Sequence, residues 1–334
     1  MKTFAVGDIH GCAKELSALI EEMKPSSEDT VVFLGDYIDR GPDSKGVVEQ
    51  ILQLKNRCRV VCLKGNHEAM FLDFLESPES SGAGLFILNG GTATLASYAG
   101  PGGSFELPQD HLEFFYSLQT TYEDANFFFV HAGVPVKALK EIDAEADEMT
   151  MLWGRQPFLS SNFLWEKIVV HGHTPVEKPE LLTNRINVDT GCVYDGHLTA
   201  VELPAGKFHQ VPKGEKGKPF VVPPDPGGQR MAVRYKGKLP VQAGISGRKK
   251  FDFETINYNQ LGILMKETSM GPNPHFMVGD VIEGQIGLNI ESGVSFRGTV
   301  VRIEARGNVR LYGIKIEFAS FSEDGDDGRE WIRP

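Results

Sequence analysis

Five short polar motifs, each placed after an apolar run, hold most of the side chains that could do chemistry. They are Gly7-Asp8-Ile9-His10-Gly11, Gly35-Asp36-Tyr37-Ile38-Asp39-Arg40-Gly41, Gly65-Asn66-His67-Glu68, His131-Ala132-Gly133 and His171-Gly172-His173-Thr174. Five of the nine histidines lie inside these motifs. Carboxylate, imidazole and amide groups without a thiolate suit manganese, iron or zinc in a catalytic site and argue against a closed structural zinc site.

The runs before the motifs predict the elements that position them. Short continuous apolar runs suit strands buried on both faces, and here they are Phe4–Val6, Thr30–Leu34, Val60–Leu63, Phe127–Val130 and Ile168–Val170. Between them, apolar residues recur at helical spacing around Leu16–Met23 and Val47–Leu52. We therefore expect an α/β domain with its motifs at the carboxyl ends of strands, where ligand sites of open α/β sheets gather.

The motif residues divide into ligands for two cations. Side chains two apart on an extended segment point the same way, so Asp8 and His10 can share an ion. We predict that Asp36 bridges two metals, one held with Asp8 and His10, the other with Asn66, His131 and His173. Two cations about 3.5–4 Å apart can acidify a shared water and stabilise the attacking and leaving oxygens of an in-line displacement.

Length and composition bound the class of protein. A chain of 334 residues predicts two domains, and no apolar run reaches the eighteen residues of a membrane span. The first residues lack the apolar stretch of a signal peptide, so we expect a cytoplasmic protein without a membrane partner. Cys58 and Cys62 stand on one predicted strand, about 13 Å apart, and are expected to be buried free thiols.

Charge is unevenly distributed along the chain. A formal net charge of −11 argues against nucleic acid as a partner. The stretch Lys213–Lys250 carries ten basic and two acidic residues, a local charge of +8, which leaves −19 for the rest. This block indicates an anionic ligand or docking against the acidic part, with an unpartnered solvated face as the alternative.

The pattern changes after residue 210. Residues 211–228 are rich in proline, glycine and lysine and are expected to form a linker. Beyond them, Val278–Glu283, Thr299–Ile303 and Tyr312–Phe318 alternate as strands, which predicts a small all-β barrel over residues 229–320. Residues 321–334 are an acidic tail, and residues 1–210 form the α/β domain.

The order of the five motifs, with Ile186–Gly191 after them, resembles the phosphoprotein phosphatases, a calcineurin-like metallophosphoesterase family, in their bacterial serine/threonine branch. The resemblance covers about residues 1–205. It implies a metallophosphoesterase β-sandwich flanked by helices, two divalent ions that are usually manganese, and attack by a metal-bridging water. It implies that His67 is the general acid paired with Asp39, and that Arg40 and Arg155 bind the phosphate. His171 and Asp189 are left outside the metal ligands.

Three functions remain open at this stage. The first is a phosphoserine/phosphothreonine protein phosphatase, favoured because Asp39 and Glu68 are kept. The second is a nucleotide hydrolase similar to the symmetric dinucleoside tetraphosphate hydrolases. The third is a signalling receptor whose phosphatase half serves for docking.

Residues 229–320 resemble a PilZ domain, a six-stranded barrel that in many bacteria binds cyclic di-GMP. The resemblance depends on Arg230 and Arg234 before the first strand and on Asn257, Asn259 and Gly262 before the next. It implies that these five residues bind cyclic di-GMP and that the ligand regulates the phosphatase. Asn259 stands where the family motif has serine, although an asparagine side chain still offers a donor and an acceptor.

Overall fold

The computed structural model describes residues 1–78, 81–100, 104–214, 235–236, 240–259, 262–268, 274–286, 294–306 and 309–321. The chain divides into two compact units, Met1–Leu72 with Ala93–Phe220, and Asp73–Thr92 with Val221–Pro334. The second unit is not continuous in sequence, because it contains residues 73–92 as well as the C-terminal residues. Over the described ranges, no helix has the length and apolar character needed to cross a membrane.

The first sheet of the N-terminal unit places three of the motifs. Its strands are β1 (Thr3–Val6), β2 (Thr30–Phe33), β3 (Arg59–Cys62), β10 (His197–Leu203), β11 (Lys207–Pro212) and β9 (Asp189–Thr190). β1, β2 and β3 are parallel neighbours, whereas β10 pairs antiparallel with β1, β11 and β9. The carboxyl ends of the three parallel strands therefore meet at one edge, where the chain continues into the motifs that begin at Gly7, Gly35 and Gly65.

The second sheet places the two histidine motifs. It contains β4 (Thr121–Glu123), β5 (Phe127–Val130), β6 (Ile168–His171), β8 (Arg185–Asn187) and β7 (Glu180–Leu181) in that spatial order. β5, β6 and β8 run parallel. His131 and His173 therefore follow neighbouring parallel strands, as the predicted runs require.

One apolar core joins the two sheets. Val32, Leu34 and Val61 of the first sheet and its strand ends cluster with Phe129 and Val170 of the second, all nearly free of solvent exposure. These residues are apolar on consecutive or alternate strand positions, and burying them between two layers removes them from water. The predicted α/β sandwich is confirmed.

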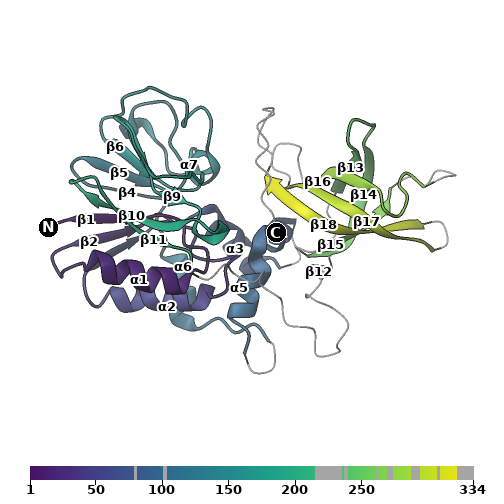
Figure 1. Cartoon of the computed structure of the whole chain (residues 1–334), viewed down its shortest axis with the longest axis horizontal. Coiled ribbons are helices and arrows are strands. Elements are labelled where there is room, and N and C mark those ends of the chain that lie inside the picture. Colours follow the sequence, from purple (N-terminus) through teal and green to yellow (C-terminus); the bar gives the residue numbers. More distant parts are fainter. Residues whose placement is uncertain are drawn as a thin grey trace. The chain divides into compact units, whose positions relative to one another are not determined.

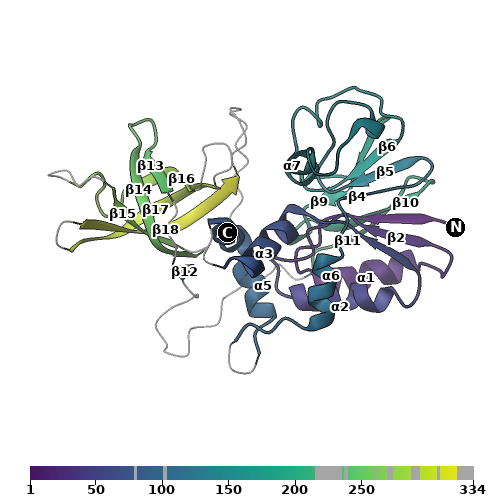
Figure 2. The same cartoon turned by 180° about the vertical axis from the view of Figure 1, so that it is seen from behind.

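Helices cover the sandwich. They are α1 (Ala13–Met23), α2 (Ser44–Leu54), α3 (Asn66–Glu76), α5 (Thr92–Ser97), α6 (Gln109–Tyr116) and α7 (Glu148–Trp153), and α4 (Ser81–Phe86) lies in the segment that groups with the C-terminal half. Figure 1 and Figure 2 show α1 and α2 side by side against the sheet that contains β1 and β2. The predicted apolar spacing holds here, since Leu16, Leu19, Val48 and Ile51 are buried.

The C-terminal unit contains a closed antiparallel barrel. Its strands are β12 (Tyr235–Lys236), β13 (Pro240–Ile245), β14 (Phe251–Asn259), β15 (Gly262–Glu267), β16 (Val281–Ile286), β17 (Val294–Arg306) and β18 (Val309–Phe321). The order β14-β13-β16-β17-β18-β15 closes because β14 also pairs with β15, and β12 adds to β14 outside this ring. The predicted six-stranded all-β barrel is confirmed.

One predicted strand begins too early. Val278–Asp280 was expected to be extended, but β16 begins at Val281 and the preceding residues form a turn. Gly279 adopts a φ of 96°, and the Asp280 side chain accepts a hydrogen bond of 2.7 Å from the Met277 backbone N–H. The glycine supplies a left-handed backbone that a strand cannot contain.

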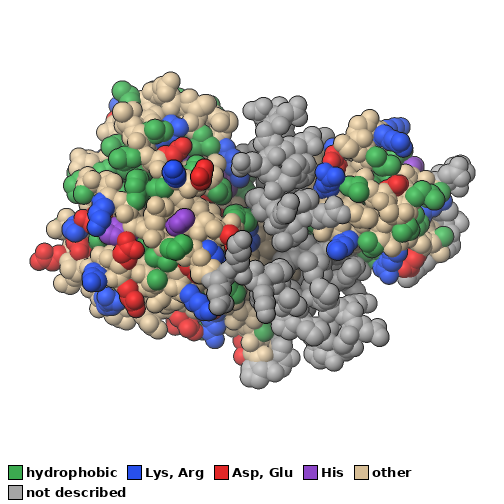
Figure 3. All heavy atoms as spheres, in the orientation of Figure 1, with side chains coloured by type: hydrophobic (Ala, Val, Ile, Leu, Met, Phe, Trp, Pro, Cys, Tyr) green, Lys and Arg blue, Asp and Glu red, His purple; other side chains and the backbone are tan. Residues whose placement is uncertain are grey.

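Cysteine and surface charge complete the description. All four cysteines are free and buried, as expected for Cys58 and Cys62. β11 continues to Pro212, two residues into the segment predicted as linker. On the face drawn in Figure 3, acidic and basic side chains are interspersed over the N-terminal unit rather than separated into patches of one sign.

Candidate active site

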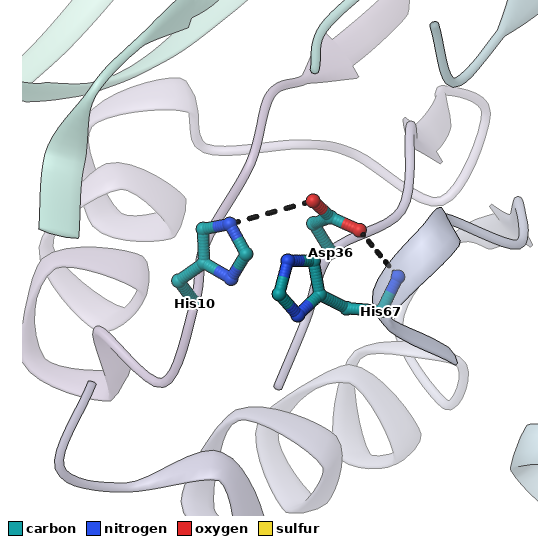
Figure 4. Close-up of side chains that lie close together, drawn as sticks. All are labelled: His10, Asp36 and His67. Carbon is teal, nitrogen blue, oxygen red and sulfur yellow. Dashed lines mark hydrogen bonds and ion pairs between the residues drawn. The ribbon is translucent and has the colours of Figure 1, made fainter. Parts of the chain in front are cut away.

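His10, Asp36 and His67 meet although they come from three motifs (Figure 4). The Asp36 Oδ2 atom lies 3.4 Å from His10 Nε2, and the His67 backbone N–H donates to Asp36 Oδ1 at 3.2 Å. The two imidazole rings stand edge to face with centroids 4.7 Å apart. One potential ligand atom from each residue lies within 4.8 Å of the others, so the three side chains form one buried cluster.

A second cluster shares Asp36 and adds groups from the other sheet. His131 Nε2 lies 3.5 Å from Asp36 Oδ1, 2.9 Å from Asn66 Oδ1 and 3.2 Å from His173 Nδ1. His173 Nδ1 is in turn 3.1 Å from Asn66 Oδ1. Asp36 therefore stands between two groups of candidate ligands, as the sequence predicts for a bridging carboxylate.

The hydrogen bonds of the imidazoles fit bound cations. His131 Nδ1 donates to the Leu34 carbonyl at 2.9 Å, and His10 Nδ1 donates to the Ile38 carbonyl at 2.8 Å. Burial lowers the pKa of His131 to about 3, so the ring is neutral and its Nε2 carries a lone pair. That lone pair faces the side-chain oxygens of Asn66 and Asp36, and a cation suits such a convergence of donor atoms.

Asp8 supplies a further carboxylate at the edge of the two clusters. Both its oxygens accept from the His173 backbone N–H at 3.2 Å. Burial, followed by the charges of Asp189 and Asp36, raises the pKa of Asp8 well above its usual range. Burial and the charge of Glu68 do the same for the pKa of Asp36. Several carboxylates packed together out of water favour a cationic partner.

The sequence analysis paired Asp8 with His10 on the assumption that both lie on an extended segment, and this assumption is wrong at His10. The segment is not extended at His10, whose φ is 45°, so the two side chains are not placed by strand alternation. In the structure His10 groups with Asp36 and His67, while Asp8 contacts the His173 backbone. The assignment of Asp8, His10, Asp36, Asn66, His131 and His173 as metal ligands stays a prediction.

His67 and Asp39 form a buried pair beside the clusters. His67 Nδ1 donates to Asp39 Oδ2 at 2.6 Å, and both side chains are almost fully buried. His67 Nε2 is buried and has no hydrogen-bond partner among the residues that the structure describes. Burial lowers the pKa of His67 and raises that of Asp39.

Two arginines approach the same place. Arg40 donates to His10 Nε2 at 2.6 Å, and its guanidinium lies 5.6 Å from the ring centroid of Tyr194. Arg155 follows α7, and its Nε is buried without a partner within the described ranges. Burial, followed by the charges of His131 and Arg155, lowers the pKa of His173, so Arg155 lies near the second cluster.

Sequence reasoning used Glu68 only to choose between families, and the structure gives it a positioning role. Its carboxylate accepts from the backbone N–H groups of Asp36, Tyr37 and Gly65 at 2.8, 2.9 and 3.0 Å. It thereby fixes the two loops that follow β2 and β3. The Gly-Asn-His-Glu motif contained the signal, since its last residue is an acid in the first turn of α3, close after β3.

Tyr194 was not predicted, because a single aromatic residue in a turn resembles any surface tyrosine.

The two residues that the sequence analysis left outside the ligand set, Asp189 and His171, have different surroundings. Asp189 lies close enough to Asp8 for their charges to interact, and burial raises its pKa to about 6. His171 packs edge to face on Phe158 with ring centroids 4.9 Å apart, and burial lowers its pKa to about 4.

Three of the five residues predicted to bind cyclic di-GMP lie among the described residues. Arg230 and Arg234 lie outside the described residues. Asn257 and Asn259 belong to β14 and Gly262 begins β15, with Asn259 paired to Gly262 across the two strands. The backbone therefore brings Asn259 and Gly262 together at one end of a strand pair.

A family model for the calcineurin-like phosphoesterases matches residues 1–203, well over half of the chain. The chain belongs to the calcineurin-like phosphoesterase family. Membership implies a metal-dependent hydrolase of phosphoesters with a binuclear metal site, and this phosphoesterase has two buried histidine–carboxylate clusters that could hold metal ions.

Two relatives have names that state different activities. The asymmetrical bis(5'-nucleosyl)-tetraphosphatase PrpE of Anoxybacillus flavithermus is 27% identical over 246 residues, covering 64% of this chain and 98% of the relative. Serine/threonine-protein phosphatase 1 of Salmonella typhimurium is 29% identical over 211 residues, covering 60% of this chain and 91% of the relative. Both are similar to the phosphoesterase half, and neither decides its substrate.

The barrel is similar to a solved structure at a low level. The solved structure is the PilZ domain of YcgR from Escherichia coli with c-di-GMP. The match covers 26% of this chain and 77% of the PilZ chain, at 12% identity and a TM-score of 0.23. At this level the likeness carries no argument about ligands.

Proposed function

We propose that this phosphoesterase hydrolyses phosphoserine and phosphothreonine in proteins. The His67–Asp39 pair is the observation that supports this substrate class most strongly. A serine or threonine alkoxide is a poor leaving group, and a positioned proton donor accelerates its departure by about 10²–10⁴. The pair, with a 2.6 Å hydrogen bond at Nδ1 and an Nε2 that has no partner among the described residues, suits that work.

Each residue of the site then has a task of its own. Asp39 holds the His67 ring in one orientation and stabilises its protonated form, from which Nε2 gives the proton to the leaving oxygen. Arg40 and Arg155 bind the nonbridging phosphoryl oxygens, because a planar guanidinium matches two oxygens at once. Two divalent cations, when bound by the six predicted ligands, supply Lewis acidity toward the phosphoryl group and toward water.

A substrate comparison tests the proposal. The intact protein, chelated and then supplied with manganese, iron or zinc, is assayed on a phosphothreonine peptide and on a dinucleoside tetraphosphate. We expect metal-dependent release of phosphate from the peptide by direct water attack. Trapping of a covalent phosphoenzyme, or turnover of the tetraphosphate alone, overturns the proposal.

A second candidate function is asymmetrical hydrolysis of dinucleoside tetraphosphates. Support comes from the PrpE relative, which this chain matches over 98% of that relative's length. A phosphoanhydride leaving group is already a fair anion, so this reaction needs little from His67. Loss of His67 should then leave the rate nearly unchanged, and the products should be a nucleoside triphosphate and a monophosphate in equal amounts.

We also propose that the barrel binds cyclic di-GMP through Arg230, Arg234, Asn257, Asn259 and Gly262, and that binding changes phosphatase turnover. The closed six-stranded ring and the +8 stretch that contains both arginines support this proposal. Coupling between two sites typically amounts to about 1–3 kcal/mol, which corresponds to about 5- to 150-fold in activity.

Calorimetry on the intact chain tests the receptor proposal, with a double variant Arg230→Ala/Arg234→Ala as the control. Binding heat that the double variant loses supports the proposal. A dissociation constant of about 1 μM corresponds to a binding free energy of about −8 kcal/mol and gives measurable heat at tens of micromolar ligand. If the intact chain gives no heat at that ligand concentration in low salt, the proposal fails.

A further inference from the structure

Thr94 of α5 contacts Asp39 twice, although the two residues lie 55 positions apart. Its Oγ1 accepts from the Asp39 backbone N–H at 2.8 Å and donates to Asp39 Oδ1 at 2.6 Å. The second bond takes the single proton of the Thr94 hydroxyl, while the hydroxyl oxygen is the acceptor in the first. Thr94 is 0% exposed, so water cannot replace either bond.

Ser44 completes this arrangement from α2. Its Oγ lies 3.1 Å from Thr94 Oγ1 and accepts from the Asp39 N–H at 3.2 Å. Because the Thr94 proton goes to Asp39, Ser44 is the donor in the bond between the two hydroxyls. Every hydrogen-bonding position of the Thr94 hydroxyl is therefore occupied. A fully satisfied buried polar group of this kind holds a single geometry.

The backbone at Asp39 needs such support. Asp39 and Arg40 have φ values of 72° and 65°, in the left-handed region that residues other than glycine rarely adopt. Such conformations persist when the surrounding structure over-determines them, and they gather at functional sites. Thr94 holds both the amide and the carboxylate of Asp39. The other carboxylate oxygen of Asp39 accepts the 2.6 Å hydrogen bond from His67 Nδ1.

We propose that Thr94 is a positioning residue for proton donation by His67, which it orients through Asp39. The proposal deepens and depends on the proposed phosphomonoesterase function, since it concerns the same proton. Without Thr94, the Asp39 carboxylate can rotate about its side-chain bonds, the His67 ring loses its fixed direction, and the leaving oxygen receives its proton less well.

The test uses leaving groups of different basicity on the intact protein. Thr94→Val removes both hydrogen bonds at nearly constant volume, and Thr94→Ser keeps the hydroxyl. For Thr94→Val we expect kcat on an alkyl phosphate to fall by about 10- to 100-fold with KM within about threefold, while an activated aryl phosphate loses less than about threefold. Thr94→Ser should restore most of the alkyl rate.

A matched control is available on the same helix. Ser97 accepts from the Lys45 backbone N–H at 2.9 Å and so joins α5 to α2 without touching Asp39. Ser97→Ala should leave the ratio of alkyl to aryl rates unchanged. If Thr94→Val does not fold, Thr94→Cys keeps a similar volume with a weak donor and acceptor and is measured in its place.

A second measurement separates positioning from general loss of structure. In a His67→Asn background, Thr94→Val should lower the alkyl rate no further, because the group that it orients is gone. An equal loss in both backgrounds, or equal losses on alkyl and aryl substrates, overturns the proposal for Thr94. If His67→Asn itself leaves the alkyl-to-aryl ratio unchanged, the general-acid function fails, and the Thr94 proposal fails with it.

Discussion

At the scale of single residues, one imidazole nitrogen carries the strongest chemical signal. His67 Nδ1 is occupied by Asp39, while Nε2 is buried without a partner among the described residues. Leaving a buried polar atom unpaired costs about 1–3 kcal/mol, so its persistence indicates a transient partner. A leaving oxygen of the substrate has the chemistry of that partner.

His67→Asn should therefore damage substrates in proportion to the basicity of their leaving group. We expect kcat on a phosphoserine peptide to fall by about 10²–10⁴, with binding little changed because the metal ligands and arginines remain. An aryl phosphate such as p-nitrophenyl phosphate should lose far less. Steady-state kinetics on the two substrates makes the measurement, and equal losses on both contradict the assignment of His67 as the acid.

At the scale of secondary structure, the site depends on how closely the loops after parallel strands approach one another. A Cβ atom at Gly172, after β6, would stand 2.3 Å from Asp8 Oδ1, after β1. Only a residue without a side chain allows this approach. The sandwich thus brings a carboxylate of one sheet against the backbone of the other.

Gly172→Ala should displace Asp8 and weaken metal binding. We expect manganese affinity, measured by calorimetry on the chelated protein, to fall at least about tenfold, the scale set by loss of an orienting contact at a metal site. Gly214→Ala is the matched control, because its nearest neighbour would be Glu15 Oε1 at 3.4 Å, an ordinary contact. Unchanged affinity in Gly172→Ala would show that Asp8 does not need its present position.

A second prediction at this scale concerns the entry to β2. The buried Asp29 carboxylate accepts from the Lys2 N–H at 2.7 Å, the Ser26 N–H at 2.9 Å and the Ser26 hydroxyl at 2.7 Å. Burial favours a higher pKa for Asp29, but these hydrogen bonds and nearby positive charge outweigh it and hold the pKa below its usual range. The bonds join β1 and β2 at their beginnings.

Because the folded pKa of Asp29 is lowered, the stability that it contributes is present above about pH 4 and is lost as pH falls through the folded pKa. Asp29→Asn should lower the free energy of unfolding at pH 7 by about 1–3 kcal/mol, and this deficit should shrink in acid. Denaturant unfolding from pH 2.5 to 7 measures it, with the exposed neighbour change Glu28→Gln as control. A deficit that stays constant with pH contradicts the explanation.

At the scale of the whole molecule, folding brings negative charge together. Asp8 and Asp36 are buried with pKa values raised by burial and by neighbouring carboxylates. A cation that binds only the folded chain relieves this repulsion and stabilises the protein by mass action. Metal binding should therefore be visible in stability without any substrate.

Manganese added to the chelated protein should raise the thermal midpoint, with about 2.7 kcal/mol of stabilisation at a concentration one hundred times the dissociation constant. Asp36→Asn should abolish most of this shift, because Asp36 belongs to both clusters. Asp110→Asn, an exposed change on α6, should keep it. A full shift in the Asp36 variant would show that manganese binds elsewhere.

The sequence by itself predicted the buried parallel strands, the helices α1 and α2, and the motifs that follow the strand ends. Buried parallel strands are continuously apolar, and ligand sites gather at their carboxyl ends. The local sequence was therefore enough to place Asp36, Asn66 and His131 after strands. The same reasoning predicted a barrel from alternation and glycine turns. It placed the start of β16 too early, because the left-handed backbone of Gly279 cannot be read from apolar alternation.

Only the tertiary structure decided which of these groups meet. The left-handed turn at His10 groups that residue with Asp36 and His67, although an extended segment would have paired it with Asp8. Thr94 had no signal in the chain, since an isolated threonine in a helix resembles any other until α5 packs on Asp39. Contacts between distant segments depend on packing between layers, and local sequence does not encode that packing.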